Sequence, residues 1–147
     1  MELKELLVAA IAREAAAHDL YAAAAAAARD PGVKALLTDL AHEEARHQEM
    51  LEALDADHLI SFQPETPRDA GLADSMESKP FSPQAGLQAT MAHAMRKELE
   101  ARDFYAQMAA TVGEPSAAAL FRKLAAMEAG HKARLEEQYE ATFLREN

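Results

Sequence analysis

Apolar residues recur at alternating steps of three and four along the first part of the chain. One such stripe runs from Leu3 to Tyr21 within residues 2–29, a stretch without Gly or Pro. This spacing is the period of an α-helix. The pattern stops at Asp30, and Pro31 is placed to begin a second helix as its first residue. The second helix is expected to run to about residue 57, so residues 2–57 are predicted to form an antiparallel helical hairpin.

The second part of the chain predicts another hairpin, over about residues 83–143. Its first helix should begin at the Ser82-Pro83 pair and end near Val112, and its second should run from Pro115 to Phe143. The intervening residues 58–82 are rich in Pro, Ser and Asp, and they are predicted to form a long crossover connection with a short helical turn near residues 72–76. These elements indicate one all-α domain over residues 1–147, a four-helix bundle with one long crossover.

The two halves align without a gap when the sequence is shifted by 84 positions. An internal duplication separates polar residues that recur from those that do not, and recurring ones are the better candidates for a site. His18, His42, Glu43 and His93 fall on unlike residues and are expected to be peripheral. The recurring polar pairs on the stripes are Glu14 with Glu98, Tyr21 with Tyr105, Glu44 with Glu128, and His47 with His131. Asp19 and Asp103 also recur, but they lie off the stripes and are expected on a solvated face.

Composition excludes several classes of function. The 147 residues contain no cysteine, so disulfides, iron–sulfur clusters, zinc-thiolate sites and thiol nucleophiles are excluded. With 15 Lys+Arg against 25 Asp+Glu, the formal charge is -10, which argues against a nucleic-acid partner. No run of about 18 uncharged apolar residues suggests a membrane helix. We therefore expect a soluble, cytoplasmic protein that binds neither nucleic acid nor membrane.

The recurring residues have the types and spacing of metal ligands. Glu44 and His47 stand at positions i and i+3, so both side chains leave one face of their helix. Glu128 and His131 repeat this arrangement. Glu14 and Glu98 occupy stripe positions where a bundle normally places Leu. Two such Glu together with two Glu-x-x-His pairs are the donor set of di-iron and di-manganese carboxylate bundles.

Electrostatics favours bound cations over simple burial of these groups. Each buried carboxylate carries a desolvation penalty on the order of several kcal/mol, and no Lys or Arg lies on the same stripes. Two divalent cations would balance the charge, although protonation could also relieve it. Glu44 and Glu128 are expected to bridge two ions, with Glu14 and Glu98 terminal and one His on each ion. Oxygen and nitrogen donors suit iron or manganese, and zinc remains possible.

Tyr21 and Tyr105 lie seven residues beyond Glu14 and Glu98 on the same stripes. Their hydroxyls are expected to hydrogen-bond to a ligand carboxylate of the opposing hairpin. The alternative is that both are buried aromatic side chains that close the core.

The segments that carry these residues resemble the rubrerythrin branch of the ferritin-like superfamily. They are Glu14…Tyr21, Glu44-Ala-Arg-His47, Glu98…Phe104-Tyr105 and Glu128-Ala-Gly-His131. The resemblance implies that the six Glu and His residues bind two irons and that the two tyrosines support them. It also implies a bundle that often dimerises and that reacts with hydrogen peroxide or dioxygen.

The chain departs from that family pattern in two respects. Typical rubrerythrins carry a rubredoxin-like domain whose four cysteines deliver electrons, whereas this sequence has no cysteine and would need an external reductant protein. Rubrerythrins also commonly have a further glutamate three residues after the first one of the third helix, and Ala101 occupies that position here. The resulting site would be more symmetric.

The leading hypothesis is a non-haem di-iron oxidoreductase, expected as a homodimer, that reduces peroxide or dioxygen. The dinuclear centre of Glu14, Glu44, His47, Glu98, Glu128 and His131 would be catalytic. Three alternatives remain open at this stage: a ferroxidase or iron-storage subunit, a dimanganese catalase-like protein, and a helical interaction module without activity.

Overall fold

The computed structural model describes residues 3–56 and 86–144 and contains no strand within them. Each predicted helix is present. Their bounds are α1 Leu3–Ala27, α2 Pro31–Ala56, α4 Gly86–Thr111 and α5 Pro115–Tyr139, followed by the short π-helix η2, Glu140–Leu144. The last helix was expected to stay α-helical to Phe143, but its final turn is π-helical. The predicted crossover and the Ser82-Pro83 start lie outside the described residues.

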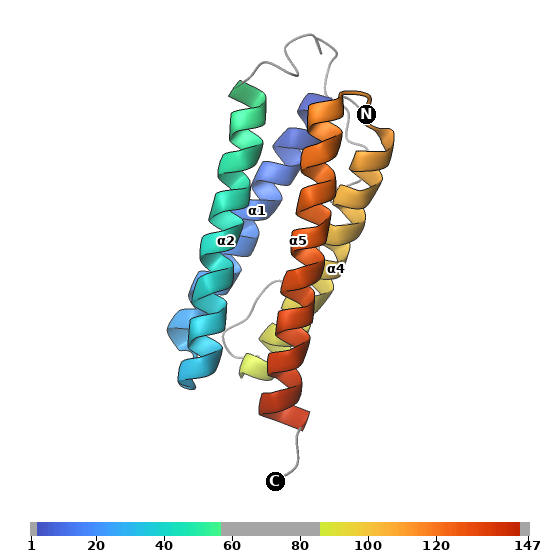
Figure 1. Cartoon of the computed structure of the whole chain (residues 1–147). Coiled ribbons are helices and arrows are strands. Elements are labelled where there is room, and N and C mark those ends of the chain that lie inside the picture. Colours follow the sequence, from blue (N-terminus) through green and yellow to red (C-terminus); the bar gives the residue numbers. More distant parts are fainter. Residues whose placement is uncertain (1–2, 57–85, 145–147) are drawn as a thin grey trace.

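The helices pair as two hairpins. α1 packs mainly against α2, and α4 packs mainly against α5. Figure 1 shows the two pairs face to face, with α2 beside α5 and α1 towards α4. The predicted four-helix bundle of two hairpins is therefore confirmed. None of the described helices is long and apolar enough to cross a membrane.

The second helix of each hairpin begins in the same way. The Val33 backbone N–H donates to Asp30 Oδ2 at 2.9 Å, and the Ala117 N–H donates to Glu114 Oε2 at 2.8 Å. In both places a proline follows the capping residue, where a missing N–H costs nothing because the first turn has no intrahelical acceptor for it. The shared start sets α2 and α5 in equivalent register within their hairpins.

The core consists of two apolar clusters separated along the bundle axis by a polar layer. One cluster contains Leu7, Leu51 and Phe121, and the other contains Leu37 and Leu135, with further residues in each. In each of α1, α2, α4 and α5, the stripe of residues three and four apart places a Glu, or a Glu and a His, between residues of the two clusters. The polar layer is thus sealed from solvent at both ends by packed side chains.

Candidate metal centre

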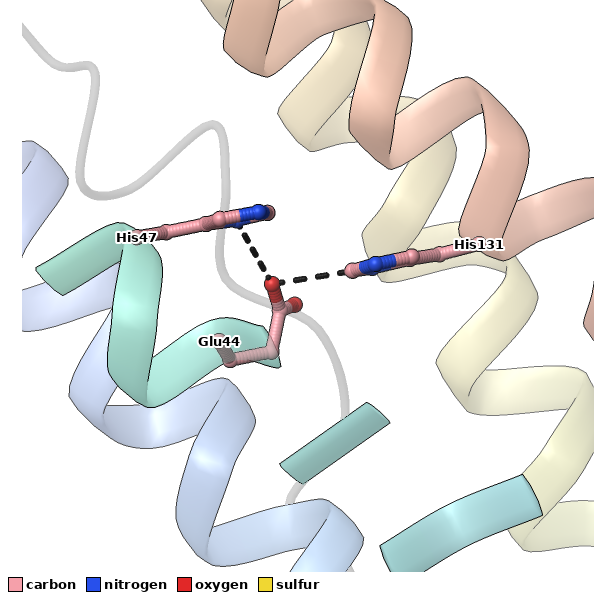
Figure 2. Close-up of side chains that lie close together, drawn as sticks. All are labelled: Glu44, His47 and His131. Carbon is pink, nitrogen blue, oxygen red and sulfur yellow. Dashed lines mark ion pairs between the residues drawn. The ribbon is translucent and has the colours of Figure 1, made fainter. Parts of the chain in front are cut away.

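All six predicted ligand side chains lie in this polar layer. One glutamate comes from α1 and one from α4, while α2 and α5 each supply a glutamate and a histidine. Each residue is at most 2% exposed, and they are Glu14, Glu44, His47, Glu98, Glu128 and His131. Figure 2 shows Glu44 pointing between the rings of His47 and His131.

The six residues form two overlapping donor groups of four members each, besides a smaller group of Glu44, His47 and His131. Glu14, Glu44, His47 and Glu128 each place a donor atom within 4.8 Å of the others, and the same is true of Glu44, Glu98, Glu128 and His131. The two larger groups share Glu44 and Glu128. Each of these two adds one glutamate and one histidine of its own. This overlap is the geometry needed for two neighbouring cations with two carboxylates in common.

Both imidazoles turn the same nitrogen towards the carboxylates. His47 Nδ1 lies 3.0 Å from Glu44 Oε1, and His131 Nδ1 lies 3.0 Å from Glu128 Oε1. The two rings are parallel within 2°, with centroids 5.5 Å apart. Each helix therefore presents a glutamate oxygen and a histidine Nδ1 to the same point.

Two tyrosines form hydrogen bonds with the glutamates of α1 and α4, each across to the opposing hairpin. The Tyr21 hydroxyl donates to Glu98 Oε2, and the Tyr105 hydroxyl donates to Glu14 Oε2. These are the bonds between opposing hairpins that the sequence predicts. Burial raises the pKa of both tyrosines well above 10, and the neighbouring carboxylates raise it further, so both hydroxyls remain donors. Within the described residues, the other oxygen of each carboxylate, Oε1, has no hydrogen-bond partner.

The shared carboxylates hold protons strongly when no metal is bound. Burial, reinforced by repulsion from Glu14 and Glu98, raises the pKa of Glu44 and Glu128 well above the ordinary 4.5. Burial alone would lower the pKa of His131. The carboxylates of Glu128 and Glu98, 3.0 and 3.4 Å from Nδ1, and further carboxylate charge instead raise the pKa of His131 to about 12. In the metal-free protein, protons therefore offset part of the negative charge of the layer.

Glu14 behaves differently from the two shared carboxylates. Burial disfavours its charged form, but the nearby His47 ring, whose Nδ1 lies 3.5 Å from Glu14 Oε1, and the charge of Arg13 outweigh burial and lower the pKa of Glu14. Glu14 is thus held ionised by its neighbours.

Unpartnered donor atoms test whether these residues fit a metal pair. An isolated buried polar atom costs about 1–3 kcal/mol when it lacks a hydrogen bond. Within the described residues, the unpartnered buried atoms of the six predicted ligands are Glu14 Oε1, both Glu44 oxygens, both His47 nitrogens, Glu98 Oε1, both Glu128 oxygens and His131 Nδ1. Nearly all of these atoms belong to the two donor groups, and carboxylate oxygens with imidazole nitrogens suit iron, manganese or zinc. The residues present therefore fit two divalent ions.

Arg13 brings a positive charge to the layer, although no Lys or Arg lies on the stripes themselves. It is 8% exposed, its Nη1 lies 3.8 Å from Glu128 Oε2, and its Nη2 donates to the Lys97 carbonyl at 2.6 Å. Arg13 precedes Glu14 by one residue and so lies off the stripe, but its long side chain reaches the layer. Position 97, its counterpart in the repeat, is also basic, which is a signal that could have identified it.

Glu43 was expected to be peripheral, and this is wrong. Its Oε1 accepts a hydrogen bond from His131 Nε2 at 2.8 Å, and its Oε2 accepts one from Arg134 at 2.9 Å. Burial disfavours its charge, but these bonds lower the pKa of Glu43, so it is an ionised acceptor. Comparing the hairpins could not find it, because it occurs in only one of them. The remaining histidines, at positions 18, 42 and 93, belong to no donor group of the described residues.

Known proteins resemble the chain over almost its whole length. The family model described as Rubrerythrin matches residues 5–139, which include the six donors and both tyrosines. Among solved structures, a hypothetical protein from Pyrococcus furiosus is similar, with a TM-score of 0.75 and 26% sequence identity. The similarity covers 95% of this chain and 89% of that one. No curated protein matches the sequence significantly.

Proposed function

Because the chain belongs to the rubrerythrin family, we propose that its polar layer binds two iron ions and reduces hydrogen peroxide or dioxygen. One observation carries the proposal: two donor groups overlap in Glu44 and Glu128 and keep one glutamate and one histidine each. Glu44 and Glu128 would bridge the irons. Glu14 and His47 would complete one position, and the corresponding residues of the second hairpin would complete the other.

The protein side chains set the conditions for this chemistry. The two apolar clusters exclude water from the layer and so strengthen every electrostatic interaction inside it. Tyr21 and Tyr105 each hold one oxygen of a terminal carboxylate and leave the other free to bind. Arg13 adds a positive charge beside Glu128, which offsets the excess of carboxylates over imidazoles.

A bound ferrous pair would polarise the O–O bond and supply one electron from each ion. Hydrogen peroxide takes up these two electrons and two protons, its O–O bond breaks, and two water molecules form. The irons must then be reduced again. Since the sequence contains no cysteine, we propose that the electrons come from a separate electron-transfer protein.

The set of donor residues is symmetric, because each hairpin supplies two glutamates and one histidine. Ala101, which stands where related proteins commonly carry an additional glutamate, is fully buried in an apolar cluster. No carboxylate of α4 other than Glu98 belongs to the donor groups of the described residues. The proposed reaction therefore depends on six ligands that stay in place.

Anaerobic protein loaded with ferrous iron provides the test. One equivalent of hydrogen peroxide should oxidise two irons per chain, as measured by the ferrous iron that a chelator still detects. Glu44→Ala should abolish this reaction, because both positions lose a donor. Glu49→Ala, an exposed change on the same helix, is the matched control and should react like the unmodified protein.

Equal rates of peroxide consumption by Glu44→Ala and the unmodified protein would contradict the proposal. Oxidation that deposits many irons per chain would favour an iron-storage role instead. Oxygen release by manganese-loaded protein, with no reaction of the iron form, would favour a catalase-like role.

A further inference from the structure

A chain of charged residues supports His131 from outside the metal centre. Its Nε2 donates to Glu43, Glu43 accepts from Arg134, and Arg134 Nη2 donates to Asp39 Oδ2 at 2.6 Å. Glu43 is 19% exposed, while Arg134 and Asp39 are about half exposed. The bonds join α2 to α5 and lead from the buried ring to the surface. They also keep the Glu43 carboxylate aimed at the imidazole.

The other half of the centre lacks this support entirely. The shift of 84 positions places Met127 opposite Glu43, Met50 opposite Arg134 and Lys123 opposite Asp39. Neither methionine nor lysine offers a strong acceptor to an imidazole N–H. Accordingly, His47 Nε2 has no hydrogen-bond partner among residues 3–56 and 86–144, although His47 is fully buried.

This difference bears directly on metal binding. A histidine ligand whose second nitrogen donates to a carboxylate is fixed in orientation and tautomer and becomes a more basic donor. His131 has such a partner and keeps Nδ1 aimed at the carboxylates, whereas His47 has none. Arg13 does not create the difference, since the carboxylate that its Nη1 approaches, at 3.8 Å, is Glu128, which both halves share.

Given the two cations of the proposed function, we propose that the halves of the centre are unequal. The position formed with Glu98 and His131 binds its ion first and more tightly than the position formed with Glu14 and His47. Glu43 is the positioning residue that creates this order, and it acts through His131.

Cobalt(II) added stepwise to the metal-free protein under anaerobic conditions tests the order of binding. Visible absorption and calorimetry should resolve two binding steps, with dissociation constants at least about tenfold apart. In crystals loaded with one equivalent of cobalt, anomalous density beside His131 Nδ1 should exceed that beside His47 Nδ1.

Variants distinguish a positioning role from a merely structural one. Glu43→Ala should weaken the first step about 10–100-fold and leave the second unchanged. Glu43→Gln, which retains an acceptor oxygen without the charge, should weaken the first step less than Glu43→Ala does. Met127→Glu, which installs an acceptor at the repeat position of the other half, should strengthen the second step. The two dissociation constants should then differ less. Glu49→Ala should change neither step.

Two equal steps in the unmodified protein would overturn the inference and leave the proposed function standing. A first step that Glu43→Ala leaves unchanged would also overturn it, as would equal weakening of both steps together with a lower melting temperature of the metal-free variant. Failure to bind any cobalt would overturn the proposed centre itself.

Discussion

Several side chains in the polar layer use one polar atom to bind another protein group and leave a second atom available for a metal ion. In Glu14 and Glu98, one oxygen accepts a tyrosine hydroxyl, and the other has no hydrogen-bond partner in the described part of the chain. In His131, Nε2 binds Glu43 and Nδ1 faces the carboxylates. Atoms with a protein partner thus fix the orientation of those without one.

Tyr105→Phe should reduce metal affinity about 10–100-fold, because Glu14 loses the bond that orients it. Tyr21→Phe should have a similar effect through Glu98. Equilibrium titration of the metal-free variants gives the affinities. Tyr139→Phe is the control, since Tyr139 bonds to Gln88 and lies outside the donor groups. Unchanged affinity in both site variants would show that the tyrosines only fill the core.

Metal binding should become tighter as the pH rises from about 5.5 to 7.5. Burial raises the pKa of Glu44 and Glu128 well above 4.5, and carboxylate contacts raise that of His131 to about 12, so an incoming ion must displace protons. Calorimetry in buffers with different ionisation enthalpies should therefore detect proton release on binding. Binding without proton release at any pH would contradict these pKa shifts.

The same shifts fix how the stability of the metal-free protein varies with pH. For Glu44 and Glu128 the folded pKa exceeds the unfolded 4.5, so their contribution is present below pH 4.5 and is lost as pH rises through the folded pKa. The contribution of His131 is complete below its unfolded pKa of 6.5 and is lost as pH rises towards about 12. Glu14 acts oppositely, since its lowered pKa favours folding above pH 4.5. Metal should therefore raise the melting temperature more at pH 7.5 than at 5.5.

Repetition within the sequence identifies the donors and tyrosines, because each hairpin needs its own copy. It does not identify Glu43, whose role exists in one hairpin only, and helical spacing does not identify Arg13, which lies off the stripe. Both act through long side chains that cross between elements. Their partners are set by packing between helices, and the period of one helix carries no information about that packing.

At the level of elements, the bounds of the helices follow from local chemistry. The caps Asp30 and Glu114 and the prolines after them are visible in the sequence and start α2 and α5 as predicted. The change to π-helix at Glu140 is not visible, because apolar spacing does not report which carbonyl each N–H selects. Tyr139 and Phe143 remain in contact across this change, with ring centroids 5.1 Å apart.

Asp30→Ala should lower the free energy of unfolding by about 1 kcal/mol, and Glu114→Ala should do the same, because each removes a cap acceptor. For a chain of this length, that corresponds to a fall of roughly 2–4 °C in the melting temperature. Urea unfolding of the metal-free variants measures the change, with Glu49→Ala as a surface control. Both variants should still bind two ions per chain. Loss of metal binding would show that the caps position the ligands as well.

Across the whole molecule, two apolar clusters enclose a layer that the fold alone does not require. Four glutamates occupy positions that leucine could fill, and the charge of Glu44 and Glu128 opposes folding unless protons or cations balance it. The layer therefore makes the metal-free bundle less stable and at the same time enables it to bind ions.

Glu44→Leu should consequently stabilise the metal-free protein, by about 1–4 kcal/mol as for other buried charges replaced by packed apolar side chains. The same variant should bind no metal pair, because both donor groups lose a member. Denaturant unfolding and metal analysis after desalting measure the two effects. A less stable metal-free variant would indicate that Glu44 supports the fold directly.

Anomalous diffraction at the iron edge, from crystals grown with ferrous iron, locates the ions most directly. The proposed two-iron centre predicts two peaks per chain, about 3.5–4 Å apart, both within bonding distance of Glu44 and Glu128. One peak should also touch Glu14 and His47, and the other Glu98 and His131. A single peak, peaks elsewhere on the bundle, or side chains turned towards solvent would contradict it.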